Sequence, residues 1–178
     1  GVMIEDQKWP KKCGHTKGKD VVDLDEANSR IKAAVDAREY GNKDILIMAR
    51  TDAIATRGLD DAIKRMQSFS KLGVDILFIE AVKNKEDMKR IIKEVPGHHM
   101  LNLIEDGETP LLEINEIEEI GYKIAVMPLT LMSASVKTMQ ECLNNMKNKV
   151  YNKNVSKFSD LRDIVGFNEY YDIEDKYK

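Results

Sequence analysis

Two short runs near the start of the chain carry residue types that do chemistry. They are IEDQ at residues 4–7 and KKCGH at residues 11–15. In the first run, Glu5 and Asp6 directly follow an apolar stretch. Carboxylates at the end of a strand can hold Mg2+ directly or through its water molecules. These two residues are therefore candidate metal-binding groups.

The second run surrounds a cysteine with cationic side chains. Lys12 and His15 lie within two residues of Cys13. Nearby positive charge favours the thiolate form of a cysteine and makes it usable as an acid, a base or a nucleophile. Gly14 would let this loop close tightly over a ligand. The same residues also fit a solvated, lysine-rich loop with an incidental thiol, so composition alone leaves both interpretations open.

Further polar side chains follow the other apolar runs of the chain. Arg50 and Asp52 follow one run, Glu80 the next, and Asn102 lies inside a third. Structural roles are open for each: Arg50 could pair with Asp52 or Glu80, Glu80 could only position other groups, and Asn102 could bond to the backbone. His98 and His99 follow Pro-Gly at the wrong spacing for a helical metal pair, so we predict a surface turn there. Cys142 is predicted to fill an apolar helix face.

The apolar runs alternate with amphipathic helical patterns, which gives the order βαβαβαβαβα. The predicted strands are Val2–Ile4, Ile45–Ala49, Val74–Ile79, Met100–Ile104 and Ile124–Met127, and a long helix at about 131–148 and a shorter one at about 158–165 follow them. Continuous apolar strands indicate a parallel sheet covered by helices. Side chains at the C-terminal ends of such strands build the sites of barrels and of doubly wound sheets. The periodicity alone does not decide between these two folds.

Length and charge limit the classes of function. The 178 residues carry a formal net charge of −3 that is mixed along the chain, which argues against a nucleic-acid-binding face. No apolar run reaches the ~18 residues of a membrane span. Two distant cysteines make no disulfide framework, so a cytoplasmic location is expected. We predict one domain over 1–178, with barrel elements in 1–130 and C-terminal helices in 131–178. The apolar start, without a lead-in, suggests a fragment.

Taken in chain order, the motifs resemble the isocitrate lyase and phosphoenolpyruvate mutase superfamily, and within it the 2-methylisocitrate lyases most closely. IEDQ followed by KKCGH is the specific part of the resemblance. Weaker single features follow in the family's order: ARTDA at 49–53, EA at 80–81, Asn102, EDG at 105–107, TP at 109–110, GY at 121–122, PLT at 128–130 and GF at 166–167. The resemblance implies a partial (β/α)8 barrel, with about strands 4–8 present and C-terminal helices. A complete barrel takes ~250 residues.

The resemblance also implies an activity: a Mg2+-dependent lyase, with Mn2+ as a possible substitute, that cleaves a carbon–carbon bond beside an α-keto acid. Glu5 matches the metal-side carboxylate, and Cys13 the loop thiol that exchanges a proton with the carbanion of the departing dicarboxylate. Arg50 matches the arginine at the substrate oxyanion and carboxylate. Glu80 and Asn102 match residues that line the same pocket, and Lys12, Gly14 and His15 match the substrate-binding loop.

Several functions remain open within this resemblance. They are a 2-methylisocitrate-like lyase, an oxaloacetate decarboxylase, a dimethylmalate lyase, a phosphonomutase, and an inactive truncated barrel that acts only in subunit association. The family's metal-binding aspartates belong to earlier strands than those of this chain. Ser133 stands where several of the lyases have arginine, which leaves the substrate open. The expected partners are a small carboxylate and further copies of the chain, in a dimer or tetramer with helix exchange.

Overall fold

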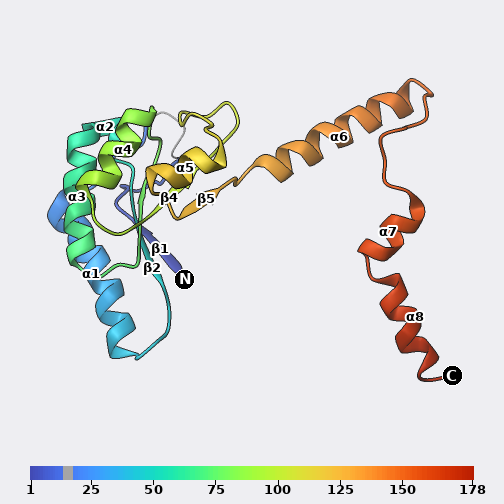
Figure 1. Cartoon of the computed structure of the whole chain (residues 1–178), viewed down its shortest axis with the longest axis horizontal. Helices are drawn as coiled ribbons and strands as arrows, with labels where there is room; N and C mark the ends of the chain where they lie inside the picture. Colours follow the sequence, from blue (N-terminus) through green and yellow to red (C-terminus); the bar gives the residue numbers. More distant parts are fainter. Residues whose placement is uncertain (14–17) are drawn as a thin grey trace. The chain divides into compact units, whose positions relative to one another are not determined.

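The computed structural model describes residues 1–13 and 18–178 of the chain. Its sheet contains five strands, β1 (Val2–Glu5), β2 (Ile47–Thr51), β3 (Ile76–Ile79), β4 (His98–Asn102) and β5 (Ile124–Val126). All neighbours pair in parallel, in the order β1-β2-β3-β4-β5 (Figure 1). A doubly wound sheet reverses its strand order at a switch point, whereas this order follows the sequence throughout. The sheet is therefore part of a (β/α)8 barrel.

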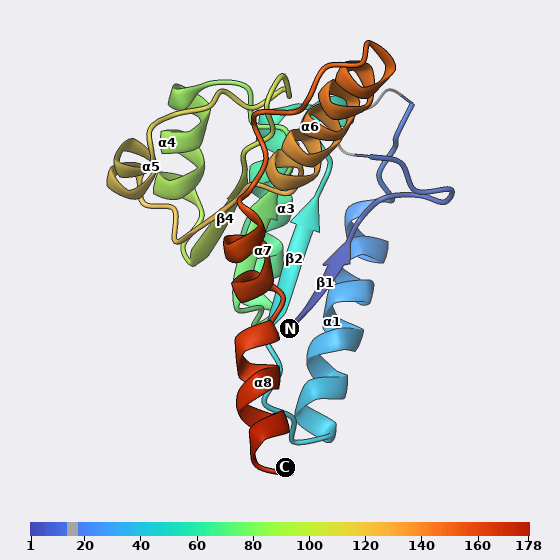
Figure 2. The same ribbon diagram turned by 90° about the vertical axis from the view of Figure 1, so that its right-hand side faces the viewer.

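The strands connect through helices that lie on one face of the sheet. Unit by unit these are α1 (Leu24–Tyr40), α2 (Ile54–Arg57), α3 (Leu59–Lys71), α4 (Lys85–Glu94) and α5 (Ile114–Ile120). The carboxylate of Asp23 caps α1 by accepting a hydrogen bond from the backbone N–H of Glu26. Figure 2 shows β1 and β2 side by side, with α1 running along them. The short helix α2 was missing from the sequence prediction.

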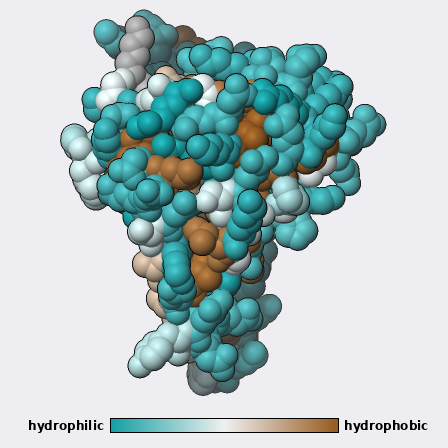
Figure 3. All heavy atoms as spheres, turned by 90° about the vertical axis from the view of Figure 1, so that its left-hand side faces the viewer, coloured by the Kyte–Doolittle hydropathy of each residue, from teal (hydrophilic) through white to brown (hydrophobic). Residues whose placement is uncertain are grey.

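The hydrophobic core lies between the sheet and these helices. From the helices it takes Ile31, Met66, Phe69 and Met88, and from the sheet Leu77, Ile79 and Leu101. The outer surface of the helices, seen in Figure 3, is mostly hydrophilic. The core thus holds the strands in register and leaves their C-terminal ends to carry polar side chains.

One sequence prediction about β4 is wrong. The strand begins at His98 rather than Met100, and the side chain of His99 is buried, with 2% of its surface exposed. Its Nε2 lies 2.9 Å from the carbonyl oxygen of Val95, and its ring packs edge-on against Tyr122. A histidine whose polar atom has a partner costs little to bury, so His99 belongs to the core and not to a surface turn.

The chain divides into two compact units, residues 1–131 and 132–178. The second unit contains most of α6 (Thr130–Lys147), together with α7 (Phe158–Ile164) and α8 (Phe167–Asp175). None of its side chains is buried in the structure, and Cys142 is half-buried rather than a core filler. The helix α8 was not predicted from the sequence. Among the described residues, no helix is long and apolar enough to cross a membrane.

Candidate active site

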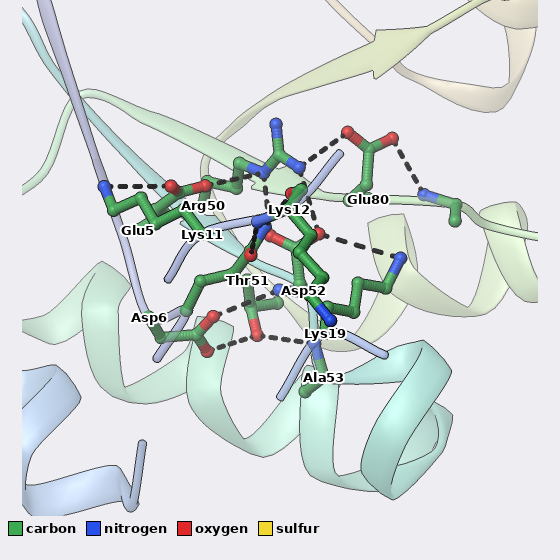
Figure 4. Close-up of polar contacts among 12 residues, drawn as sticks. Glu5, Asp6, Lys11, Lys12, Lys19, Arg50, Thr51, Asp52, Ala53 and Glu80 are labelled. Carbon is green, nitrogen blue, oxygen red and sulfur yellow. Dashed lines mark hydrogen bonds and ion pairs between the residues drawn. The ribbon is translucent and has the colours of Figure 1, made fainter. Parts of the chain in front are cut away.

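A cluster of charged side chains surrounds Arg50 at the C-terminal end of the sheet (Figure 4). Arg50 holds Asp52 with both arms of its fork: Nε donates to Oδ2 at 2.8 Å and Nη2 donates to Oδ1 at 2.9 Å. Nη2 also lies 3.0 Å from Oε2 of Glu80, and Nε lies 3.3 Å from Oε2 of Glu5. One guanidinium therefore contacts three carboxylates.

The sheet register explains this convergence. Glu5, at the end of β1, pairs with Arg50 of β2, which in turn pairs with Phe78 of β3. Two residues further along the chain, Glu80 lies just past the end of β3, and its Oε2 accepts a 3.3 Å hydrogen bond from Nδ2 of Asn102. The sequence predicted that these side chains converge at one end of a parallel sheet, and the structure confirms it.

The electrostatics of this cluster favour a permanently charged arginine. Burial by itself lowers the pKa of Arg50, but the hydrogen bonds and charges of Asp52, Glu80 and Glu5 outweigh that effect, and the pKa is raised. The side chain is only 12% exposed and stacks over the ring of Phe78 at 5.2 Å. Its Nη1 makes no hydrogen bond or ion pair with any described residue. One face of the fork is thus available to an anionic ligand.

The loop with Cys13 starts beside this cluster. Lys11 Nζ lies 2.9 Å from Oε1 of Glu5. Lys12 is exposed, and its backbone is held by the side chain of Gln7, which accepts from Lys12 N and donates to Lys12 O, both at 2.9 Å. Cys13 is exposed. Two further predicted loop residues, Gly14 and His15, lie outside the described part of the chain.

Asp6 behaves differently from its neighbour Glu5. Its carboxylate points away from the Arg50 cluster, accepts from Thr51 Oγ1 at 2.5 Å and from Asp52 N at 3.1 Å, and pairs with Arg65 Nη1 at 3.1 Å. Burial raises the pKa of Asp6, although these partners pull it down. With all of its oxygens engaged inside the core, Asp6 is a structural group and not the metal-binding carboxylate that its position suggested.

Two residues beside the site, Arg65 and Lys19, were not predicted from the sequence. Arg65 on α3 is 1% exposed and also bonds Asp61 through Nε at 2.6 Å. Lys19 follows the cysteine loop, and its side chain is 5% exposed and lies 3.9 Å from Oδ1 of Asp52. A cation within the apolar face of α3 was a usable signal for Arg65. Lys19 stands in a lysine-rich run, and nothing in the sequence distinguished it.

The residues described fit a divalent cation only in part. Glu5 lies at the end of β1, but its two oxygens are occupied by Lys11 and Arg50. Within residues 1–13 and 18–178, no group of three or more acidic, histidine or cysteine side chains is placed to hold a metal. Mg2+ takes near-octahedral oxygen coordination and often keeps several waters. Glu5 therefore stays a predicted ligand of such a site.

Sequential parallel strands with acids and an arginine at their C-terminal ends define a class of protein, the (β/α)8 enzymes. Within that class, residues 1–147 match the family model described as phosphoenolpyruvate phosphomutase. The chain belongs to this family, which is part of the isocitrate lyase and phosphoenolpyruvate mutase superfamily.

Named relatives span several activities. A 2,3-dimethylmalate lyase from Eubacterium barkeri is 39% identical over 99% of this chain and 62% of its own length. The 2-methylisocitrate lyase of Escherichia coli is 34% identical over 99% of this chain and 59% of its own. The solved structure of a 2,3-dimethylmalate lyase matches with a TM-score of 0.87 and 30% identity, over 98% of this chain and 59% of that one. The chain thus spans roughly three fifths of these relatives.

An oxaloacetate acetylhydrolase in complex with the inhibitor 3,3-difluorooxalacetate matches with a TM-score of 0.88 and 26% identity, over 98% of this chain and 60% of that one. Members of the family are therefore lyases, mutases and a hydrolase that share this sheet. Membership supports an enzymatic role and leaves the reaction to be argued from the site.

Proposed function

We propose that this chain forms part of a Mg2+-dependent carbon–carbon lyase. The substrate is a 2-hydroxy di- or tricarboxylate similar to 2-methylisocitrate, and the products are pyruvate and a dicarboxylate. The observation that carries the proposal is the Arg50 cluster: a largely buried guanidinium whose Nε and Nη2 are held by Glu5, Asp52 and Glu80. Relatives named as 2-methylisocitrate and 2,3-dimethylmalate lyases support the same chemistry.

In this mechanism Arg50 binds the substrate through Nη1, which makes no hydrogen bond within residues 1–13 and 18–178. The substrate hydroxyl gives up its proton to water as the carbon–carbon bond breaks, and its oxygen becomes the keto oxygen of pyruvate and carries negative charge on the way. A fixed donor aimed at that oxygen or at the adjacent carboxylate stabilises the transition state without reorganisation. Glu80 and Asp52 hold the guanidinium in place, and Asn102 in turn orients Glu80. Lysine would lack the planar fork that this arrangement requires.

The departing dicarboxylate takes the electron pair of the broken bond as a carbanion. Cys13 donates its thiol proton to that carbon, and the thiolate formed is close to the cations of its loop, Lys11 and Lys12. Gly14 and His15 complete the substrate-binding part of the loop in this proposal. Exposure of Cys13 is consistent with a group that reaches the ligand from a loop.

The proposed Mg2+ supplies Lewis acidity at the keto oxygen when bound, and Mn2+ is a plausible replacement. Glu5 would hold it from this chain. We also propose a cytoplasmic protein that assembles into dimers or tetramers, in which the long helix at about 131–148 exchanges between copies and 1–130 form the barrel part.

Product analysis of the complete protein tests the proposal. The protein is incubated with Mg2+ and, separately, 2-methylisocitrate, 2,3-dimethylmalate, oxaloacetate and phosphonopyruvate, and the products are followed by NMR. We expect pyruvate and a dicarboxylate from 2-methylisocitrate. Turnover of oxaloacetate alone would favour the decarboxylase alternative, and turnover of phosphonopyruvate alone a phosphonomutase. No turnover of any of them would support the inactive barrel that only associates with other subunits.

A further inference from the structure

Lys19 stands out because it is a buried lysine at the foot of the cysteine loop. Lysine side chains are almost never buried unless they are paired. This one is 5% exposed, and its Nζ lies 3.9 Å from Oδ1 of Asp52, whose side chain is fully buried. In Figure 4 the lysine reaches Asp52 from the side opposite Arg50. A single carboxylate therefore lies between two cations, one from the sheet and one from the loop.

The backbone directly after Lys19 is pinned to the segment that follows β1. Lys8 N donates to Asp20 O at 2.9 Å, and Val22 N donates to Asp6 O at 2.9 Å. Between them, Gln7 and Val21 form an antiparallel bridge. This stem brings the segment after the loop back beside the end of β1. Lys19 therefore leaves a fixed backbone and reaches into the site.

The two ends of the loop each contact an acid that touches Arg50. Before Cys13, Lys11 pairs with Glu5 at 2.9 Å, and after it, Lys19 pairs with Asp52. The first contact is weakly buried, since the side chain of Lys11 is 42% exposed. Solvent-exposed pairs contribute little, whereas breaking a buried pair leaves an uncompensated charge. Of the two, Lys19 is the contact that can fix the loop against the sheet.

We infer that Lys19 is a positioning residue: its ion pair with Asp52 ties the loop of Cys13 to the fork of Arg50. The inference rests on the proposed function for its catalytic consequence only. Through Asp52 the lysine keeps the bidentate orientation of Arg50, and because Lys19 follows Cys13 by six residues it limits how far the chain at Cys13 can move from the sheet. The proton donor and the substrate-binding arginine are thus placed by one shared carboxylate.

The test compares Lys19→Met with Lys8→Met in the complete protein. Lys8 is the matched control because it stands in the same stem and pairs with Asp20 at 2.6 Å, with both side chains 50% exposed. The first readout is the rate at which iodoacetamide alkylates Cys13, measured by mass spectrometry of its peptide. We expect Lys19→Met to change this rate by about tenfold, because the loop loses a buried ion pair. Lys8→Met should leave the rate unchanged.

The second readout is turnover of the carboxylate substrate. In Lys19→Met, kcat should fall by about 100-fold with little change in KM, since misplacement of a reacting group by about 1 Å has that effect. Lys19→Arg keeps the charge and should recover part of kcat. An unchanged alkylation rate in Lys19→Met, or an equal change in Lys8→Met, would overturn the inference.

A replacement variant and a readout that does not depend on turnover complete the test. If Lys19→Met does not fold, as judged by circular dichroism, Lys19→Gln replaces it, because glutamine keeps a donor without the charge. The alkylation comparison does not require turnover. A parent protein that cleaves none of the carboxylates would therefore contradict the proposed function, while the alkylation rates would still decide whether Lys19 positions the loop.

Discussion

Two ion clusters lie back to back at the ends of β1 and β2, and they differ in how open they are. The Arg65 cluster (Asp6, Thr51, Asp61 and Arg65) is closed: the Arg65 and Asp6 side chains are each 1% exposed. The Arg50 cluster (Glu5, Lys11, Lys19, Arg50, Asp52 and Glu80) has a donor atom, Nη1 of Arg50, without a partner among the described residues. The Arg65 cluster is the more deeply buried, since the Arg50 and Glu5 side chains are 12% and 13% exposed, and the Arg50 cluster is the one that we propose binds a ligand.

Neighbouring residues of the same strands build both clusters. Successive side chains of a strand point to opposite faces, so Glu5 and Asp6 separate, as do Arg50 and Thr51. One member of each pair enters the site and the other enters the core. A charged motif at a strand end therefore contains two kinds of residue, those that do chemistry and those that hold the strands together.

The largest effect is expected at Cys13. In the complete protein, Cys13→Ser should lower kcat by roughly 10²–10⁴-fold, the usual value of general acid–base catalysis, with KM nearly unchanged. Serine fills almost the same space, but its hydroxyl gives up a proton far less readily than a thiol. Steady-state kinetics provide the measurement, with Cys142→Ser as the control. Parent-like turnover of the Cys13 variant would make that cysteine a bystander.

For the Arg65 cluster, the expected effect is a loss of stability. Arg65→Met removes one partner of a buried ion pair and leaves Asp6 charged or forced to protonate, which costs about 3–5 kcal/mol. Denaturant titration measures the free energy of unfolding. The matched control is Arg90→Met on α4, whose arginine is 44% exposed and pairs with Asp60 and Glu94; its stability should hardly change. Equal losses in the two variants would contradict a structural role for the Arg65 cluster.

A smaller effect, on the pH dependence of stability, is expected for His98 and His99, which are again one exposed and one buried neighbour on a strand. Burial lowers the pKa of His99 below its ordinary value of 6.5, so the folded protein binds fewer protons than the unfolded chain. The contribution of His99 to the free energy of unfolding should be full above about pH 6.5 and should decline as the pH falls below that value. His99→Gln should flatten this decline, whereas His98→Gln, at an exposed position, should not. Identical pH dependence in both variants would show that His99 is not the responsible group.

The strands and most helices could be predicted from the sequence because continuous apolar runs and amphipathic periods mark them directly. The start of β4 could not, because His98 and His99 read as polar and only the fold supplies the Val95 carbonyl that satisfies His99. The convergence of Glu5, Arg50, Glu80 and Asn102 followed from parallel strand ends alone. Their roles as substrate and metal groups stay predictions.

Other parts of the site needed the structure. The side chains of a strand alternate between its two faces, which was a signal that Glu5 and Asp6 diverge. The sequence prediction instead took both as metal-binding groups. The burial of Lys19 depends on a loop whose path no local pattern determines. The second unit contains a missed signal. The helices α6 and α7 were predicted from periodicity, whereas α8 was not, although Phe167, Tyr170 and Tyr171 recur at helical spacing in it.

The most direct test of the division is Arg50→Lys in the complete protein, with kcat/KM and unfolding measured on the same preparation. Lysine keeps the charge but cannot hold Asp52 with two bonds while presenting a third donor to a ligand. We predict that kcat/KM falls by about 100-fold or more, while the free energy of unfolding changes far less than in Arg65→Met. Retention of parent-like kcat/KM would contradict the account, because the Arg50 cluster would then be a second structural ion network and not the active site.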